Sequence, residues 1–371
     1  MPARKADIED LLTLRAVARE AGQLALDYLK KGEVKTWDKT KGHPVTEADI
    51  AVNNLIQRRL MQARPDYGWL SEETTLDNKT RHGSRVWVVD PIDGTRAFIG
   101  GRPYWCIGIA VLEAGRSRVG VVYAPALDEM YEARIDGGAF LNGRPIRVSD
   151  RTTEADARII TNESILSHPG WPTPWPPVEL VKPKPNATLL RMCWVAAGKC
   201  DAVIALLRKS DWDLAPGTII VAEAGGLAQT HKGEPYVFNR SEPAQRSLLA
   251  AGKALHSLLT ARVNGVRLPD PNWAVRPNDT TPDTEPDPMG NTVESKQLLH
   301  IVIGGILKDV TDVQFEDLSQ IDFVGAFPSY VEAYDAWRGA AQRTVDNAEM
   351  RYFILHAHKL LDPETGDHHR V

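Results

Sequence analysis

The stretch Trp87-Val88-Val89-Asp90-Pro91-Ile92-Asp93-Gly94-Thr95 carries the strongest local signal in the chain. Its apolar residues predict a strand, and we expect Pro91 to end it because proline has no N–H for a sheet ladder. Gly94 favours a tight turn into a short helix at 95–99. Two carboxylates three residues apart can share a hard cation, and free amides at the helix start can bind a phosphate oxygen. Alone, the motif also fits an ordinary Asp-Gly turn.

Three further acidic motifs lie on either side of this stretch. Asp49 follows Thr46 with the spacing of a capping box, the pair Glu72-Glu73 follows a short apolar run, and Asp213 precedes an apolar helix in the segment 212–217. Each has a simpler structural explanation, namely a capping carboxylate, a solvated loop end and a helix N-cap. Only their joint occurrence therefore carries functional information.

The hydrophobic pattern predicts a mixture of helices and strands. Apolar residues at helical spacing predict two opening helices, one over 14–28 and one that begins at Thr46. Strand-like runs follow at 85–89, 105–112, 119–123, 130–134, 157–161 and 201–207, and two more helices are expected at 188–197 and 213–224. Residues 167–185 contain seven prolines and predict a partly extended surface loop.

Composition excludes several classes of protein. The net charge of −5 gives no electrostatic reason to expect a nucleic-acid polymer or an anionic membrane as partner. Three cysteines without a CxxC pair suggest neither a disulfide framework nor a zinc site, so we expect reduced thiols in a cytoplasmic protein. The first thirty residues do not resemble a signal peptide, and the longest apolar run, 298–307, is too short to span a membrane.

A polar, proline-rich segment divides the chain. Residues 266–296 are too polar to bury a core, so we interpret them as a linker between a domain at 1–265 and a small α+β domain at 297–371. In the second domain, strands are expected at 298–306, 321–327 and 350–358 and a helix at 330–343. This small domain resembles an uncharacterised bacterial domain family, and its sequence assigns it no function.

The four acidic motifs occur in an order typical of the inositol monophosphatase superfamily of Mg²⁺-dependent, lithium-sensitive phosphatases. The family shows an aspartate, a Glu-Glu pair, DP(I/L)DG(S/T) and WDxAxG; here these are Asp49, Glu72-Glu73, 90–95 and 212–217. The segments 42–49, 120–125 and 138–143 match as well, so the chain resembles the family over roughly residues 7–262. The resemblance implies an α/β (α+β) fold, a layered αβαβα sandwich, that forms a homodimer.

The resemblance also implies a metal centre. By position, the first Mg²⁺ would be held by Glu72, Asp90 and the carbonyl of Ile92, and the second by Asp90, Asp93 and Asp213. Two or three Mg²⁺ ions per active site are expected, and oxygen ligands suit this cation. Without metals, such converging carboxylates would repel a phosphate ester. Two cations roughly 4 Å apart would instead activate a water and stabilise the leaving oxygen.

Catalytic and phosphate-binding roles follow from the same resemblance. Thr95, hydrogen-bonded to Asp49, would help Glu72 orient and deprotonate the attacking water, and no covalent phosphoenzyme is required. The amides of Gly94 and Thr95, together with Asp93, would contact the phosphate and the substrate.

Substrate preference is less defined. A glutamate that contacts inositol in animal members corresponds, by ungapped counting, to Leu206, and this departure disfavours inositol. Arg208 and Lys209 could instead bind a second phosphate, with Lys182 and Lys184 as further candidates, although all four could equally be surface charges. We therefore expect a 3′(2′),5′-bisphosphate nucleotidase. The alternatives are an inositol-1-monophosphatase, a histidinol-phosphatase, or a regulatory protein without catalysis that senses a phosphometabolite.

Two smaller expectations remain. The loop at 35–42 contains Lys39 and Lys41, one of which would approach the catalytic water or the phosphate by analogy with the family. Pro216 stands where many family members have alanine. We expect it in the first turn of the helix that follows Asp213, where its missing N–H has no intrahelical partner to lose.

Overall fold

Two units make up the chain, Met1–Leu268 and Pro269–Val371. The structure, a computed structural model, describes residues 5–32, 35–40, 43–74, 81–166, 171, 173–265, 300–306, 315–327, 333, 336–337 and 350–356. The expected linker, Lys41 and most of the helix expected at 330–343 lie outside these residues. None of the described helices is long and apolar enough to cross a lipid bilayer.

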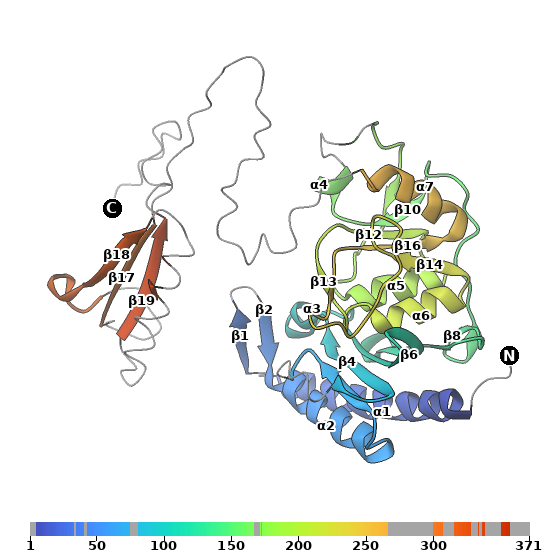
Figure 1. Ribbon diagram of the computed structural model, residues 1–371, viewed down its shortest axis with the longest axis horizontal. Helices are drawn as coiled ribbons and strands as arrows, with labels where there is room; N and C mark the ends of the chain where they lie inside the picture. The colour runs from blue at the N-terminus through green and yellow to red at the C-terminus, as the bar shows by residue number, and fades with distance from the viewer. Residues whose placement is uncertain are drawn as a thin grey trace. The chain divides into compact units, whose positions relative to one another are not determined.

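The first unit has a large, mainly antiparallel sheet covered by two long helices. The helices are α1 (Lys5–Lys30) and α2 (Glu47–Ala63), and they pack on one face of the sheet (Figure 1). Within the described part of the chain, this sheet has the order β3 (Gly68–Ser71), β4 (Arg85–Asp93), β5 (Cys106–Glu113), β6 (Arg116–Ala124), β7 (Glu129–Arg134), β8 (Ala139–Leu141) and β9 (Arg144–Pro145). Only the pair β3–β4 is parallel.

A second, smaller sheet lies farther along the chain. In the described residues its order is β11 (Glu179–Leu180), β10 (Arg158–Ile160), β12 (Ala202–Ala205), β16 (Leu248–Gly252) and β14 (Gly226–Gln229). Helices α5 (Thr188–Ala196) and α6 (Ala215–Glu223) lie between the two sheets, and α7 (Lys253–Val263) covers the outer face of the second (Figure 1). The expected αβαβα layering is therefore confirmed.

Short elements complete the first unit. They are the hairpin of β1 (Thr36–Thr40) and β2 (His43–Thr46), helices α3 (Thr95–Ile99) and α4 (Glu163–Leu166), and the pair β13 (Lys209–Ser210) and β15 (Ala244–Gln245). The segment 35–42, expected as a loop, thus includes strand β1. The proline-rich segment 167–185 was also expected to be loop, but β11 inside it pairs in parallel with β10.

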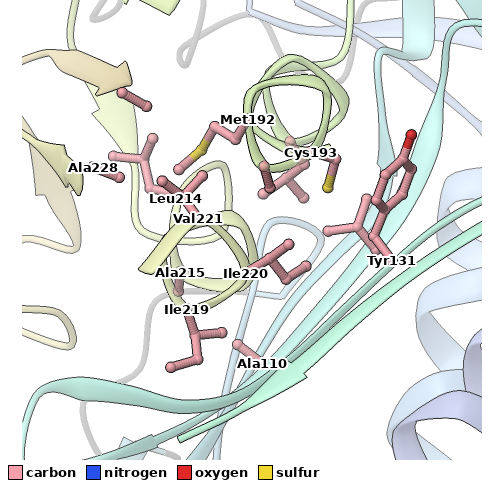
Figure 2. Close-up of a cluster of buried hydrophobic side chains, with 14 of the residues drawn as sticks. Ala110, Tyr131, Met192, Cys193, Leu214, Ala215, Ile219, Ile220, Val221 and Ala228 are labelled. Carbon is pink, nitrogen blue, oxygen red and sulfur yellow. The ribbon is translucent and has the colours of Figure 1, made fainter. Parts of the chain in front are cut away.

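The interior consists of apolar layers on both faces of the sheets. Trp87 and Val89 of β4 belong to the cluster beneath α1 and α2, whereas Val86 and Val88 belong to the cluster that includes α5 and α6. A strand buried on both faces reads as a continuous apolar run, which explains the sequence signal at 85–89. Figure 2 shows the second cluster, where Met192 of α5 lies beside Leu214, the N-cap of α6, and Val221 of α6.

The structure corrects two sequence expectations. Pro91 does not end β4, which continues to Asp93. The register shifts between Asp90 and Asp93, so that the proline occupies a bulge where no ladder N–H is needed. The helix expected at 213–224 begins at Ala215 with Leu214 as N-cap, so Asp213 is not its cap. Pro216 does lie in the first turn, as expected.

The second unit is described as a three-stranded antiparallel sheet. The strand order within its described part is β18 (Asp322–Phe327), β17 (His300–Ile306) and β19 (Met350–His356). These strands match the expected runs at 298–306, 321–327 and 350–358 to within two residues. The Trp337 indole donates to the Tyr352 carbonyl at 2.8 Å, which fixes a neighbouring segment against β19.

Candidate active site

Three segments bring acidic side chains to one region of the first unit. Because β3 and β4 are parallel, their carboxyl ends meet at the same sheet edge, where Glu72 follows β3 and Asp93 ends β4. Asp213 precedes α6, which packs against β5, the neighbour of β4 in the sheet, and against β6. The sequence separates these residues widely, but the sheet and helix packing unite them.

Asp90, Asp93 and Asp213 form the centre of this region. Each offers a carboxylate oxygen, and the three oxygens lie within 4.8 Å of one another. Asp90 and Asp93 are 1% and 7% exposed, and Asp213 is half-buried. Among the described residues, Glu72 contributes no oxygen to this group. It is close enough to Asp90 for its charge to raise the pKa of Asp90.

The electrostatics of Asp90 are dominated by burial and by other acids. Burial raises the pKa of Asp90 well above its ordinary value, and the charges of Glu72, Asp93, Asp213 and Asp49 raise it further. These four acidic neighbours thus all oppose ionisation of Asp90. Such a carboxylate either retains a proton or needs a cation beside it.

Asp93 is held by the helix that starts on the opposite side of the site. Its Oδ2 accepts the amide of Leu189 in α5 at 2.6 Å and lies 3.9 Å from the thiol of Cys106. Burial and Asp213 raise the pKa of Asp93 to about 7, although the α5 amides oppose this rise. Sequence reasoning predicted the helix but missed this contact, because no local pattern indicates that its first turn reaches a residue 96 positions earlier.

The donor set fits a hard divalent cation. The Asp90 Oδ1 atom is buried and has no hydrogen-bond partner among the described residues. A buried carboxylate oxygen without a partner is costly, whereas a cation bound to several oxygens removes that cost. Asp93 accepts the amide of Leu189 at Oδ2, and one of its oxygens belongs to the cluster with Asp90 and Asp213.

Asp49 connects the capping motif to this centre. Its Oδ2 accepts the amide and the hydroxyl of Thr46 at 2.8 and 2.6 Å, which completes the predicted capping box. Its Oδ1 lies 3.4 Å from the hydroxyl of Thr95, and that hydroxyl is also 3.1 Å from the carbonyl of Ile92. Asp49 is therefore the capping carboxylate of α2 and also contacts Thr95.

Gly94 is required by its backbone and its surroundings. Its φ is +93°, in the region that favours glycine, and a Cβ there would approach the Ala187 amide nitrogen and the Tyr104 carbonyl oxygen at 3.2 Å. The turn consequently places the start of α3, with Thr95, against the segment that leads into α5. The start of α3 and the segment that leads into α5 therefore meet at this glycine.

A cavity of about 510 Å³ lies beside Asp213. Ser210, whose amide donates to Asp213 at 2.9 Å, lines it, together with Arg208, Trp212, Ser241, Glu242, Pro243 and Ala244. Arg208 forms an ion pair with Glu242 at 2.5 Å, so its charge is already neutralised. Lys209 lies close enough to lower the pKa of Asp93 slightly, and Leu206 is nearly buried after β12. The side chain of Lys39 lies outside the described residues.

Comparisons with known proteins agree with this geometry. The family model "Inositol monophosphatase family" matches residues 7–267, and a domain of unknown function, DUF4170, matches 298–357. A histidinol-phosphatase of Chlorobaculum parvum is 33% identical over 70% of this chain and 98% of its own length. An inositol-1-monophosphatase of Rhizobium meliloti is 34% identical over 59% and 84%. The solved IMPase of Thermotoga maritima, 28% identical, superposes with a TM-score of 0.58 over 70% and 97%.

Proposed function

This chain belongs to the inositol monophosphatase family of phosphoric monoester hydrolases, and we propose that it uses Mg²⁺ to hydrolyse a small phosphorylated metabolite. The observation that carries this proposal is the convergence of Asp90, Asp93 and Asp213 on one point, with a buried Asp90 oxygen that has no hydrogen-bond partner among the described residues. The convergence also supports an enzyme over the regulatory alternative, because no acidic position of the motif set has been lost.

The proposed ligand sets follow the sequence motifs. One Mg²⁺ would be held by Glu72, Asp90 and the Ile92 carbonyl, and another by Asp90, Asp93 and Asp213, with a third ion as an option. When bound, these ions supply a water of lowered pKa and positive charge beside the leaving oxygen. Mg²⁺ suits an all-oxygen site in which several waters remain.

The chain's own groups hold the reactants. The Thr95 hydroxyl lies between Asp49 and the Ile92 carbonyl, and we propose that this arrangement, with Glu72, orients the attacking water and takes its proton. The amides of Gly94 and Thr95 would donate to the phosphate oxygens. Positioned hydrogen bonds of this kind lower the barrier because they are already oriented before reaction.

For the substrate, we propose a 3′(2′),5′-bisphosphate nucleotide. Trp212, Pro243 and Ala244 give the cavity beside Asp213 apolar walls, which suit a nucleoside better than a polyol. Leu206 provides no carboxylate for inositol hydroxyls. The Arg208–Glu242 ion pair weakens the earlier expectation that Arg208 binds the second phosphate.

A second candidate is histidinol phosphate. Two relatives that are 33% identical over about 70% of the chain, from Chlorobaculum parvum and Mycobacterium tuberculosis, carry the name histidinol-phosphatase. The Glu242 side chain at the cavity is 67% exposed, and a substrate ammonium group could replace Arg208 as the partner of this carboxylate. This carboxylate is the feature that favours the alternative.

A panel assay tests the proposal. The purified protein would be incubated with adenosine 3′,5′-bisphosphate, histidinol phosphate and inositol 1-phosphate, with Mg²⁺ or with EDTA, and phosphate release would be measured. We expect Mg²⁺-dependent release, fastest from the bisphosphate. Release that persists in EDTA would contradict the metal assignment, and faster release from histidinol phosphate would favour the second candidate.

Three further features are proposed with this function. The enzyme is a cytoplasmic homodimer that acts without nucleic-acid polymers or membranes. Light scattering coupled to gel filtration measures the molecular mass and so tests the dimer.

The proposed phosphatase domain comprises 1–265, followed by a linker at 266–296 and a small domain at 297–371. A variant truncated after Val266 should retain most of its kcat; a folded truncation that loses most of it would contradict this division.

A further inference from the structure

Two cationic side chains lie at the carboxyl edge of the second sheet. Strands β10 and β11 are parallel, with Ile159 opposite Leu180, so the residues that follow them emerge at the same edge. Asn162 follows β10, and Lys184 lies between β11 and α5. In open α/β sheets, ligands bind outside the carboxyl ends of parallel strands.

Neutral groups hold both cations. The Lys184 ammonium donates to the Asn162 side-chain oxygen at 2.6 Å and contacts the Thr161 carbonyl at 3.4 Å. Arg191, in α5, donates from Nε to the Pro185 carbonyl at 2.7 Å and from Nη2 to the adjacent carbonyl of residue 186 at 3.1 Å. Among the described carboxylates, none forms an ion pair with Lys184 or Arg191.

The two cations lie on adjoining segments, because Arg191 bonds to the carbonyl of Pro185, the residue after Lys184, and both cations retain unused donors. Burial lowers the pKa of Lys184, and the charge of Arg191 lowers it further. Lysine has three N–H donors and arginine five, so one and three donors remain beyond the bonds just described. Two neighbouring cations that form no ion pair with a described carboxylate are stabilised by an anion that bonds to both.

Arg191 of this pair lies on α5, the helix that bonds to the acidic centre. Arg191 holds the carbonyls of the segment that enters α5, and two residues before Arg191 the amide of Leu189 donates to Asp93. Burial lowers the pKa of Arg191, while the charge of Asp93 acts in the opposite direction. The guanidinium is therefore within electrostatic range of the proposed metal site. Arg208, by contrast, is neutralised by Glu242.

We propose that Lys184 and Arg191 form a subsite for a second anionic group of the substrate, so that the enzyme prefers bisphosphate esters to monophosphates. This inference rests on the proposed function, because it needs the first phosphate to bind at the centre of Asp90, Asp93 and Asp213. Lys184 contributes a point charge, and Arg191 contributes planar donors while it also fixes the entry to α5.

Calorimetric titration of the full chain tests this subsite. The probes are adenosine 3′,5′-bisphosphate and adenosine 3′-monophosphate, with Ca²⁺ in place of Mg²⁺ and phosphate release monitored to verify that turnover is absent. We expect the wild type to bind the bisphosphate at least roughly tenfold more tightly than the monophosphate. Lys184→Gln should weaken bisphosphate binding about tenfold and leave monophosphate binding within twofold. Lys253→Gln, at an exposed position of α7, is the charge-matched control and should change neither.

Two substitutions of Arg191 form the second part of this test. Arg191→Lys keeps the charge and should retain part of the preference, whereas Arg191→Gln should lose it. Any one of three results would overturn the subsite. The wild type could bind the two nucleotides equally tightly, it could bind neither, or Lys184→Gln could lose affinity equally for both. Failure of the proposed function gives a different result: the binding preference would persist, but no phosphate would be released with Mg²⁺.

Discussion

Two groups of buried carboxylates in the first unit are neutralised in opposite ways. Asp7 and Asp10 of α1 are at most 1% exposed and face arginines: Arg85 lies 2.8 Å from each of them, and Arg118 lies 2.8 Å from Asp7. At the other site, the charges that act most strongly on Asp90 are all carboxylates. The first group is complete within the protein, whereas we propose that the second takes a cation from solution. The comparison separates a structural ion-pair network from a metal site.

The largest expected effect concerns the acidic centre. Asp90→Asn removes the carboxylate shared by both proposed ligand sets, so Mg²⁺-dependent phosphate release should fall roughly a thousandfold or more. Asp150→Asn, at an exposed position, is the matched control and should keep wild-type turnover. Circular dichroism would verify that both variants fold. An Asp90→Asn variant that keeps more than a tenth of the wild-type kcat would refute the assignment.

The second prediction concerns the ion-pair network. Arg85→Met leaves Asp7 and Asp10 buried with less positive charge nearby, and we expect the free energy of unfolding to fall by about 3–5 kcal/mol. Urea titration measures this change. Arg58→Met, on the exposed face of α2, should change the free energy of unfolding by less than about 0.5 kcal/mol. Similar losses in the two variants would show that Arg85 has no special structural role.

The third prediction compares an Asp→Asn substitution in the acidic centre with one in the ion-pair network. Without metal, Asp90→Asn removes repulsion among carboxylates and should raise the free energy of unfolding by about 1–2 kcal/mol. Asp10→Asn weakens bonds with Arg85 and Arg64 and should lower it by a similar amount. Both changes are read from urea titrations in EDTA. If the two substitutions shift stability in the same direction, the comparison fails.

The smallest effect is a pH dependence of the metal-free protein. The pKa of Asp93 is raised to about 7 in the fold, so between its ordinary value near 4 and pH 7 the folded chain binds more protons than the unfolded chain. The free energy of unfolding should therefore decrease as the pH rises through this window. The decrease should be on the order of 1 kcal/mol, because neighbouring acids share the proton. Asp93→Asn should flatten the profile, and saturating Mg²⁺ should stabilise the protein most above pH 7. An unchanged slope in Asp93→Asn would assign the dependence to other groups.

The helices and strands of the first unit were largely predictable because their signals are local. The apolar run at 85–89, the capping box of Thr46 and Asp49, and the glycines after α6 each act within a few residues. The bulge at Pro91 was not predictable, because it depends on the register with β5. Strand β11 was missed because a proline-rich segment gives no apolar alternation.

For the candidate site, sequence motifs predicted that Asp90, Asp93 and Asp213 lie together but not what surrounds them. The hydrogen bond of Leu189 with Asp93, the ion pair of Arg208 with Glu242, and the contact of Lys184 with Asn162 each join segments that are more than 20 residues apart. No single-sequence pattern reports such contacts. The cationic pair at Lys184 and Arg191 became visible only once the parallel strands placed its parts at one sheet edge.

A crystal structure of the wild-type protein with Mn²⁺ in place of Mg²⁺, with anomalous scattering data, tests the central claim most directly. The account predicts anomalous peaks about 2.0–2.3 Å from carboxylate oxygens of Asp90, Asp93 and Asp213. Absence of a peak at these three residues, in a crystal of protein that releases phosphate with the same metal, would contradict it.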